Sequence, residues 1–131
     1  MKKARQEFQR ARRNHFADWW QRVATLRSEV ERPGLTLEAR IRAMGELGEA
    51  LGQRSTHIDE AIYVLRESVI MAEMMRNHSL AVTNRLRLVT ALEASGDAAA
   101  AALELERAQS TIRCYNLRPK AAPSLAGAHI H

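Results

Sequence analysis

The segment LGEALGQRSTHIDEAIYVLRES, residues 47–68, decides the fold of this chain of 131 residues. It carries Gly48 and Gly52 near the end of one apolar helical pattern, and Ala61 and Ser68 within the next. A glycine inside a helix costs about 1 kcal/mol relative to alanine, so its presence calls for a compensating contact. Small residues on two consecutive helices predict that these helices pack closely, with no space for a larger side chain between them.

Apolar residues recur at spacings of three and four on both sides of this segment, which is the pattern of amphipathic helices. Together with the turn residues, they predict helices at about residues 4–31, 37–51, 57–76, 79–95 and 98–115. Thr36 and Asp97 are expected to be N-caps, and Thr56 with Asp59 resembles a capping box. The connections are short, so neighbouring helices should be antiparallel. The predicted fold class is therefore all-α.

The second and third predicted helices are related to the fourth and fifth by an internal repeat. The first helices of the pairs align at an offset of 41 residues: Met44, Leu47, Gly48 and Leu51 with Arg85, Leu88, Val89 and Leu92. The second helices align at an offset of 40: Ala61, Leu65 and Ser68 with Ala101, Leu105 and Ala108. An unrelated helical bundle, in which an Ala-rich sequence matches by chance, is the alternative interpretation.

The pattern large-x2-Leu-Gly followed by Ala-x3-Leu-x2-small resembles the tetratricopeptide repeat (TPR). Arg85 stands where the family has a large apolar residue, and the period exceeds the usual length of about 34 residues, as in long-period repeats of bacterial regulators. The resemblance implies a fragment of a right-handed α-α superhelix. It would form a single domain over residues 1–118, with a basic N-terminal helix at 1–32, repeats at 36–76 and 79–117, and a disordered tail at 119–131.

Composition and charge limit the class of protein. The formal net charge is +5, and the whole excess lies in residues 1–32, which hold nine Lys/Arg and four Asp/Glu. Cys114 is the single cysteine, so no intrachain disulfide can form and a cytoplasmic location is expected. We also expect no membrane-spanning segment, because the longest uncharged run is too weakly apolar.

The sequence predicts no enzyme, no cofactor and no metal site. No two of the five histidines stand at the i, i+4 spacing that, with a carboxylate, marks a zinc-binding helix, and there is no Gly-rich phosphate loop. Cys114 has no histidine near it in sequence, so a structural thiol is favoured over a nucleophile. The absence of convergent acid, base or nucleophilic groups favours a binding role.

The resemblance to TPR proteins implies a non-enzymatic protein–protein interaction module, such as an adaptor, a chaperone or a sensory regulator. In that family the first helix of each pair lines a concave groove that binds a peptide or helix. The matching positions here are Arg42, Gly45, Glu49, Gln53, Thr83, Leu86, Arg87 and Thr90. The Lys and Asn with which one subgroup holds a peptide carboxylate are absent, since Gly45 and Glu49 occupy those positions.

Two further surfaces are predicted. A basic cluster near the N-terminus gives an alternative function, binding of nucleic acid through phosphate contacts; it consists of Lys2, Lys3, Arg5, Arg10, Arg12 and Arg13. A homodimer is also expected, because nothing after the last helix can cover its outer face. The candidate self-association residues are Trp20, Leu103 and Ile112, with Trp19 assigned to the core.

Overall fold

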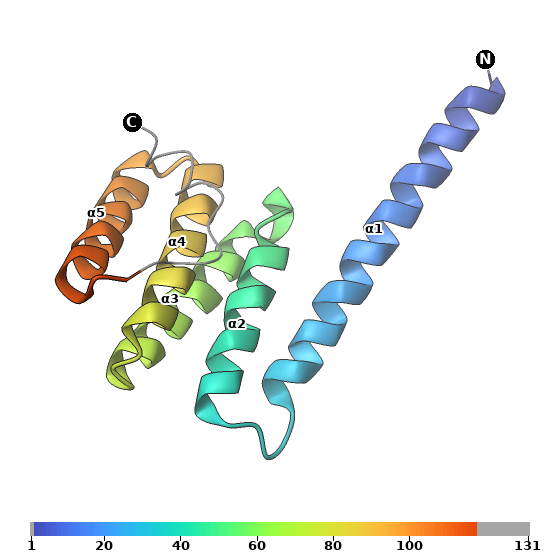
Figure 1. Ribbon diagram of the computed structural model, residues 1–131. Coiled ribbons are helices and arrows are strands. Elements are labelled where there is room, and N and C mark those ends of the chain that lie inside the picture. The colour runs from blue at the N-terminus through green and yellow to red at the C-terminus, as the bar shows by residue number, and fades with distance from the viewer. Residues whose placement is uncertain (1, 118–131) are drawn as a thin grey trace.

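A computed structural model describes residues 2–117 and places five α-helices in them, with no strand in that range (Figure 1). The tail predicted to be disordered lies outside the described residues. The helices are α1 (Lys2–Glu31), α2 (Leu37–Leu51), α3 (Ile58–Met74), α4 (His78–Ala94) and α5 (Ala98–Tyr115), and a short 3-10 turn, η1 (Ser55–His57), precedes α3. The all-α prediction is confirmed.

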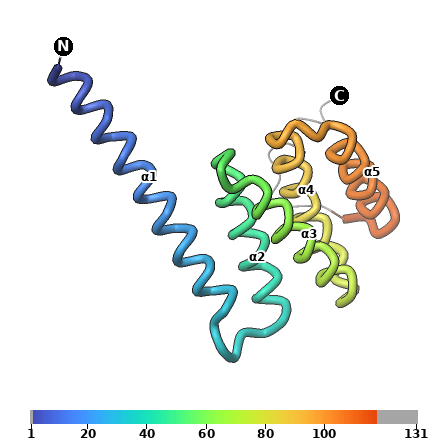
Figure 2. Tube along the Cα trace, turned by 180° about the vertical axis from the view of Figure 1, so that it is seen from behind, coloured from blue at the N-terminus to red at the C-terminus, as the bar shows by residue number. Residues whose placement is uncertain are grey.

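Each helix packs against the next one in the chain, and α2 also contacts α4 directly (Figure 2). The starts of α2 and α4 are 41 residues apart, and those of α3 and α5 are 40 apart, as the sequence repeat predicts. The unequal offsets arise because α2 stops at Leu51 and η1 follows, whereas α4 continues past the matching Leu92 to Ala94. This arrangement is compatible with a helical repeat fold.

Gly48 is required at the contact between α2 and α3. A Cβ atom at this position would lie 2.4 Å from Cγ of Leu65, which is itself fully buried. Ala61 and Ala101, at matching positions of α3 and α5, are also buried, as predicted. Gly52 differs, because a Cβ there would meet no atom closer than 3.3 Å. The close approach of α2 and α3 therefore explains the first of the two glycines but not the second.

The helix caps follow the sequence signals with one exception. Thr36 accepts a hydrogen bond from the Ala39 amide (3.1 Å), and Asp97 accepts one from the Ala100 amide (3.1 Å). The predicted capping box of Thr56 and Asp59 is wrong: the hydroxyl of Thr56 bonds to the ring of His57, and α3 starts without a side-chain cap. The 3-10 turn moves the start of α3 beyond the reach of Thr56.

The α3–α4 and α4–α5 turns have the same backbone geometry. Arg76 and Gly96 occupy equivalent positions with φ of 60° and 87°. The following residues, Asn77 and Asp97, donate their amides to carbonyls five residues earlier (2.9 and 3.0 Å), which is the Schellman arrangement. Glycine adopts this left-handed conformation without steric cost, whereas arginine does not.

We expect Arg76→Gly to raise the free energy of unfolding by up to about 1 kcal/mol, because it removes the Cβ clash of the left-handed conformation. Gly96→Ala at the equivalent turn should lower it by a similar amount. Urea unfolding followed by circular dichroism measures both. A loss of stability in Arg76→Gly would show that the exposed arginine side chain contributes more than its backbone strain removes.

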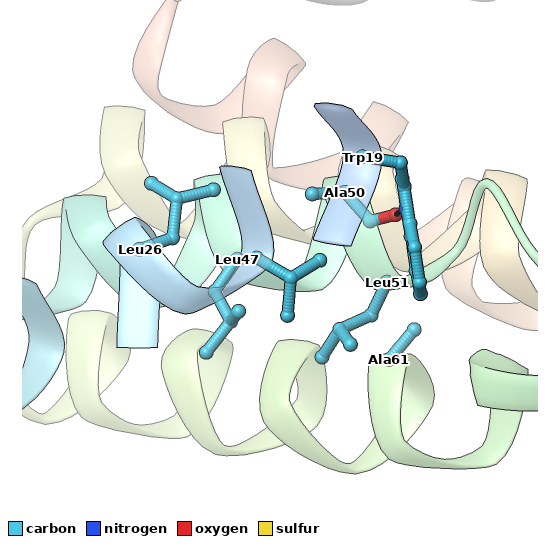
Figure 3. Packing of buried hydrophobic residues seen from close by; sticks show 7 residues of the cluster. Trp19, Leu26, Leu47, Ala50, Leu51 and Ala61 are labelled. Atoms are coloured by element: carbon cyan, nitrogen blue, oxygen red, sulfur yellow. Dashed lines mark hydrogen bonds between the residues drawn. The ribbon is translucent and has the colours of Figure 1, made fainter. Parts of the chain in front are cut away.

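The C-terminal half of α1 covers α2 through an apolar stripe. Trp19, Val23 and Leu26 are buried against Leu47 and Leu51 of α2. Figure 3 shows the Trp19 ring beside the Ala50 carbonyl, to which its indole nitrogen donates a hydrogen bond of 2.6 Å. The same carbonyl, near the C-terminal end of α2, also accepts the Gln53 amide (3.2 Å), so the Trp19 bond ties α1 to the end of α2.

Residues 2–18 of α1, which we call the arm, make no such contact. All seventeen are exposed, and in both ribbon views the arm projects away from the hairpins (Figures 1 and 2). Helical segments of this length are marginal in water without tertiary packing. The arm is thus a helical extension that is exposed around its circumference, apart from the contact of Arg54 with Phe16 at its base.

Candidate functional site

The predicted groove residues lie on α2 and α4, which pack side by side, except for Gln53 in the turn after α2. The closest approach is at Gly45, where an added Cβ would lie 2.1 Å from Oδ1 of Asn84. Asn84 is fully buried and donates its amide to the Ile41 carbonyl (3.3 Å). The absence of a side chain at Gly45 therefore lets a polar residue of α4 bond directly to the backbone of α2.

A charged bridge closes the surface above this contact. Arg87 donates to Glu49 (2.9 Å) and to Oδ1 of Asn84 (3.0 Å), so two predicted groove residues pair with each other. Arg87 is mostly covered, whereas half of the Glu49 side chain is exposed. The bridge holds the Arg87 side chain in place. A hydrogen-bond acceptor of a ligand could contact Arg87 only at the part of the side chain that is exposed to solvent.

The other groove candidates do not form a convergent cluster with this bridge, and Leu86 is wrong as a groove residue because it is buried with Val82 and Ala108. Arg42 is exposed and pairs with Glu38 one helical turn earlier (3.0 Å). Gln53 and Thr90 are exposed, and Thr83 is partly exposed; both threonine hydroxyls donate to carbonyls of their own helix. The α2–α4 surface is therefore polar, and its side-chain hydrogen-bonding groups are largely engaged within the surface.

Trp20 lies at the base of the arm, on the border between the packed and projecting parts of α1. It is 47% exposed, while the adjacent Trp19 is 6% exposed, as the helical spacing predicts. Both rings lie near His57 of η1, and Arg54 stacks over the rings of Phe16 and Trp19 (4.8 and 5.1 Å). These contacts hold α1 against the α2–α3 connection.

An ion pair joins α1 to α3 beside this cluster. Arg27 donates two hydrogen bonds to the carboxylate of Glu60, at 2.5 and 2.8 Å. The hydrogen bonds and the positive charge of Arg27 hold the pKa of Glu60 below its ordinary value of 4.5, although partial burial opposes this effect. Because the pKa is lowered in the folded state, the pair stabilises the protein at neutral pH and this contribution is lost as Glu60 becomes protonated.

Glu60→Gln is expected to lower the free energy of unfolding by up to about 1 kcal/mol at pH 7, since both partners are more than a third exposed. The difference from the wild type should persist down to the ordinary carboxyl pKa of 4.5 and shrink below it. Urea unfolding between pH 7 and about pH 3 measures this dependence. Glu46→Gln, on an exposed α2 position, is the control. A difference that does not change with pH would contradict a contribution from the charged pair.

The two self-association candidates of α5 occupy different environments. Leu103 is 48% exposed on the outer face of the helix. Ile112 is partly buried and packs with Leu117 against the cluster of Val82, Leu86 and Ala108. Leu103 is therefore the better probe of an interface on α5, and Ile112 belongs mainly to the interior of the second hairpin.

The basic candidates of the alternative function all lie on the arm. Lys2, Lys3, Arg5, Arg10, Arg12 and Arg13 are exposed. None of them forms an ion pair with another residue in the range 2–117. The guanidinium group of Arg12 lies over the ring of Phe8, 5.8 Å from its centroid and one turn away on the same helix. The arm thus combines unneutralised positive charge with exposed aromatic rings.

Sequence reasoning missed a buried ionic cluster between α3, α4 and α5. Arg85 is almost fully buried and donates to Glu104 (2.6 Å) and to Glu73. Glu104 also accepts a hydrogen bond from Arg107 (2.9 Å). The signal available in the sequence was an arginine at an apolar repeat position, which required acidic partners from neighbouring helices. This cluster connects three helices; Arg85 and Glu104 are buried at its centre, while Glu73 and Arg107 are about half exposed at its edges.

The described residues add no metal centre or membrane helix. Within 2–117, no group of three or more His, Cys, Asp or Glu side chains is placed to hold a metal ion. No helix in the same range combines the length and apolarity needed to cross a membrane. Comparison with known proteins finds no matching family model, no matching curated protein and no matching solved structure. The surfaces of the protein are therefore the basis for inferring its function.

Proposed function

We propose that this chain is a non-enzymatic protein-binding module built from two TPR-like hairpins. The observation that carries the proposal is the direct packing of α2 and α4, the first helices of the two hairpins. In the proposed repeat these helices present one surface with exposed polar groups around the Arg87–Glu49 bridge. A peptide or helix of a partner would bind there through hydrogen bonds to Gln53, Thr90 and the exposed edge of the bridge.

Site-specific photo-crosslinking in the source cell tests this proposal. A photoreactive residue at Gln53 should give a discrete protein adduct, and one at Arg113 on exposed α5 should not. Thr90→Arg, on the neighbouring part of the same surface, should weaken the Gln53 adduct because it obstructs the occupant. Equal adducts from both positions, or none from Gln53, would contradict binding at the α2–α4 surface.

The unpaired basic residues of the arm favour nucleic-acid binding as the second candidate function. Phosphate contacts release counterions, so such binding weakens steeply with salt. Fluorescence anisotropy with a short duplex DNA at several salt concentrations measures this slope. Arg10→Gln with Arg13→Gln should weaken the binding and reduce the slope if the arm contacts phosphates. Binding that is absent, or independent of these residues, would remove the second candidate.

A further inference from the structure

The outer face of α3 carries an unpartnered apolar stripe. Tyr63, Ile70 and Met74 are 67%, 51% and 80% exposed, at helical spacings of seven and four that place them on one face. Asp59 and Glu67 share this face with Arg66, which lies between Tyr63 and Ile70, and none of the three forms an ion pair with another residue in 2–117. The whole of α3 has a formal charge of −3.

The arm presents the opposite pattern on a face of the same length. Arg5, Phe8, Arg12 and Phe16 follow one another at spacings of three, four and four, so that they lie along a single face. This face continues the stripe by which Trp19 packs on α2, yet within residues 2–117 Phe8 stays 63% exposed, with Arg12 of the same helix over its ring. The arm as a whole has a formal charge of +4.

The two faces match in order as well as in charge. Arginine and phenylalanine alternate on the arm, and the α3 face reads acidic, aromatic, acidic, aliphatic from Asp59 to Ile70. Each of these four-residue patterns spans eleven positions, which is about 16 Å of helix. Apolar pairs would thus be flanked by opposite charges at Asp59 and Glu67, while Arg66 lies at the edge of the contact.

From this match we propose that the arm of one copy docks on the outer face of α3 in a second copy. Within one chain the contact cannot form, because α1 is continuous from residue 2 to 31 and the arm projects away from the hairpins in both views (Figures 1 and 2). Reciprocal docking closes a twofold dimer in which each arm covers the other copy's stripe. Pairing of two arms with each other is disfavoured, since it would bring two charges of +4 together.

This inference is independent of the α2–α4 surface and of any partner bound there. It places the self-association predicted from the sequence on α1 and α3, and leaves Leu103 of α5 outside the interface. Trp20 lies at the base of the arm, adjacent to the proposed contact.

Size exclusion with light scattering, at tens of micromolar protein, tests the proposal through charge reversal. The wild type should be a dimer, and Arg5→Glu with Arg12→Glu should weaken it about tenfold or more. Asp59→Lys with Glu67→Lys should do the same from the other side. All four substitutions together should restore the dimer, because the charges are again opposite across the contact.

A matched control separates the docking face from net charge. Arg10→Glu with Arg13→Glu makes the same charge change on other faces of the arm, and should weaken the dimer much less. Circular dichroism should report unchanged helix content for all variants, since every substituted side chain is at least partly exposed. In a Cys114→Ser background, Phe8→Cys mixed with Tyr63→Cys should form a disulfide-linked heterodimer faster than either variant alone.

Three results would overturn the proposal. A monomeric wild type at these concentrations excludes the dimer, and if such a monomer binds duplex DNA through Arg5 and Arg12 the arm is a nucleic-acid contact instead. A dimer that tolerates reversal of Arg5 and Arg12 has another interface. Failure of the fourfold variant to recover, when both pairs of substitutions dissociate the dimer, shows that the two faces do not meet.

Discussion

Arg85→Met is expected to lower the free energy of unfolding by about 3–5 kcal/mol, because it leaves the buried carboxylate of Glu104 without its main partner. Burial of an unpaired charge is costly, and Arg107, the remaining partner of Glu104, is half-exposed and only partly compensates. The loss is large relative to the total stability of about 5–15 kcal/mol typical of a protein domain. Urea unfolding at neutral pH measures it directly.

The matched experiment is a double-mutant cycle with Glu104→Leu. Glu104→Leu alone should also be destabilising, since it removes the main partner of Arg85 and leaves only the half-exposed Glu73. The double variant should lose much less than the sum, because apolar residues of similar volume often replace a buried ion pair at little cost. Additive losses would contradict coupling through the ion pair and assign the effect to packing alone.

The helix bounds could be predicted because they depend on local signals. Apolar spacing defined each helix, and the predicted ends agree with the observed ones to within two residues. Thr36 and Asp97 cap their helices through residues three positions later, which a sequence pattern contains. The predicted capping box at Thr56 was wrong because the α2–α3 connection forms a 3-10 turn. Thr56 lies inside this turn and not at the N-cap position of α3.

Contacts between distant residues could not be predicted from these signals. The Arg85 position was recognisable as a departure from an apolar repeat pattern, but its partners come from α3 and α5, so pairing requires the packed fold. Gly45 likewise gave no indication of Asn84, which is 39 positions later and reaches the backbone of α2. The groove remains a prediction, and the Arg87–Glu49 bridge between α4 and α2 was missed.

Gly48→Ala is the second large effect, with an expected loss of about 1–3 kcal/mol in the free energy of unfolding. The new methyl group would lie 2.4 Å from Cγ of Leu65, so α2 and α3 must move apart or Leu65 must leave its rotamer. Alanine is the better helix former by about 1 kcal/mol, and this gain is smaller than the cost of overpacking a fully buried contact. Thermal and urea unfolding both measure the balance.

Gly52→Ala is the control for helix propensity at the end of the same helix. Its added Cβ would meet the Gly48 carbonyl at 3.3 Å and Ala61 at 3.7 Å, so the change should be close to neutral. Leu65→Ala should cost less in the Gly48→Ala background than in the wild type, because the smaller side chain makes room for the new methyl. A Gly48→Ala protein as stable as the Gly52→Ala protein would mean that the helices do not approach closely at Gly48. The small residues at the repeat positions would then reflect the Ala-rich composition of the chain and not close packing of the helices.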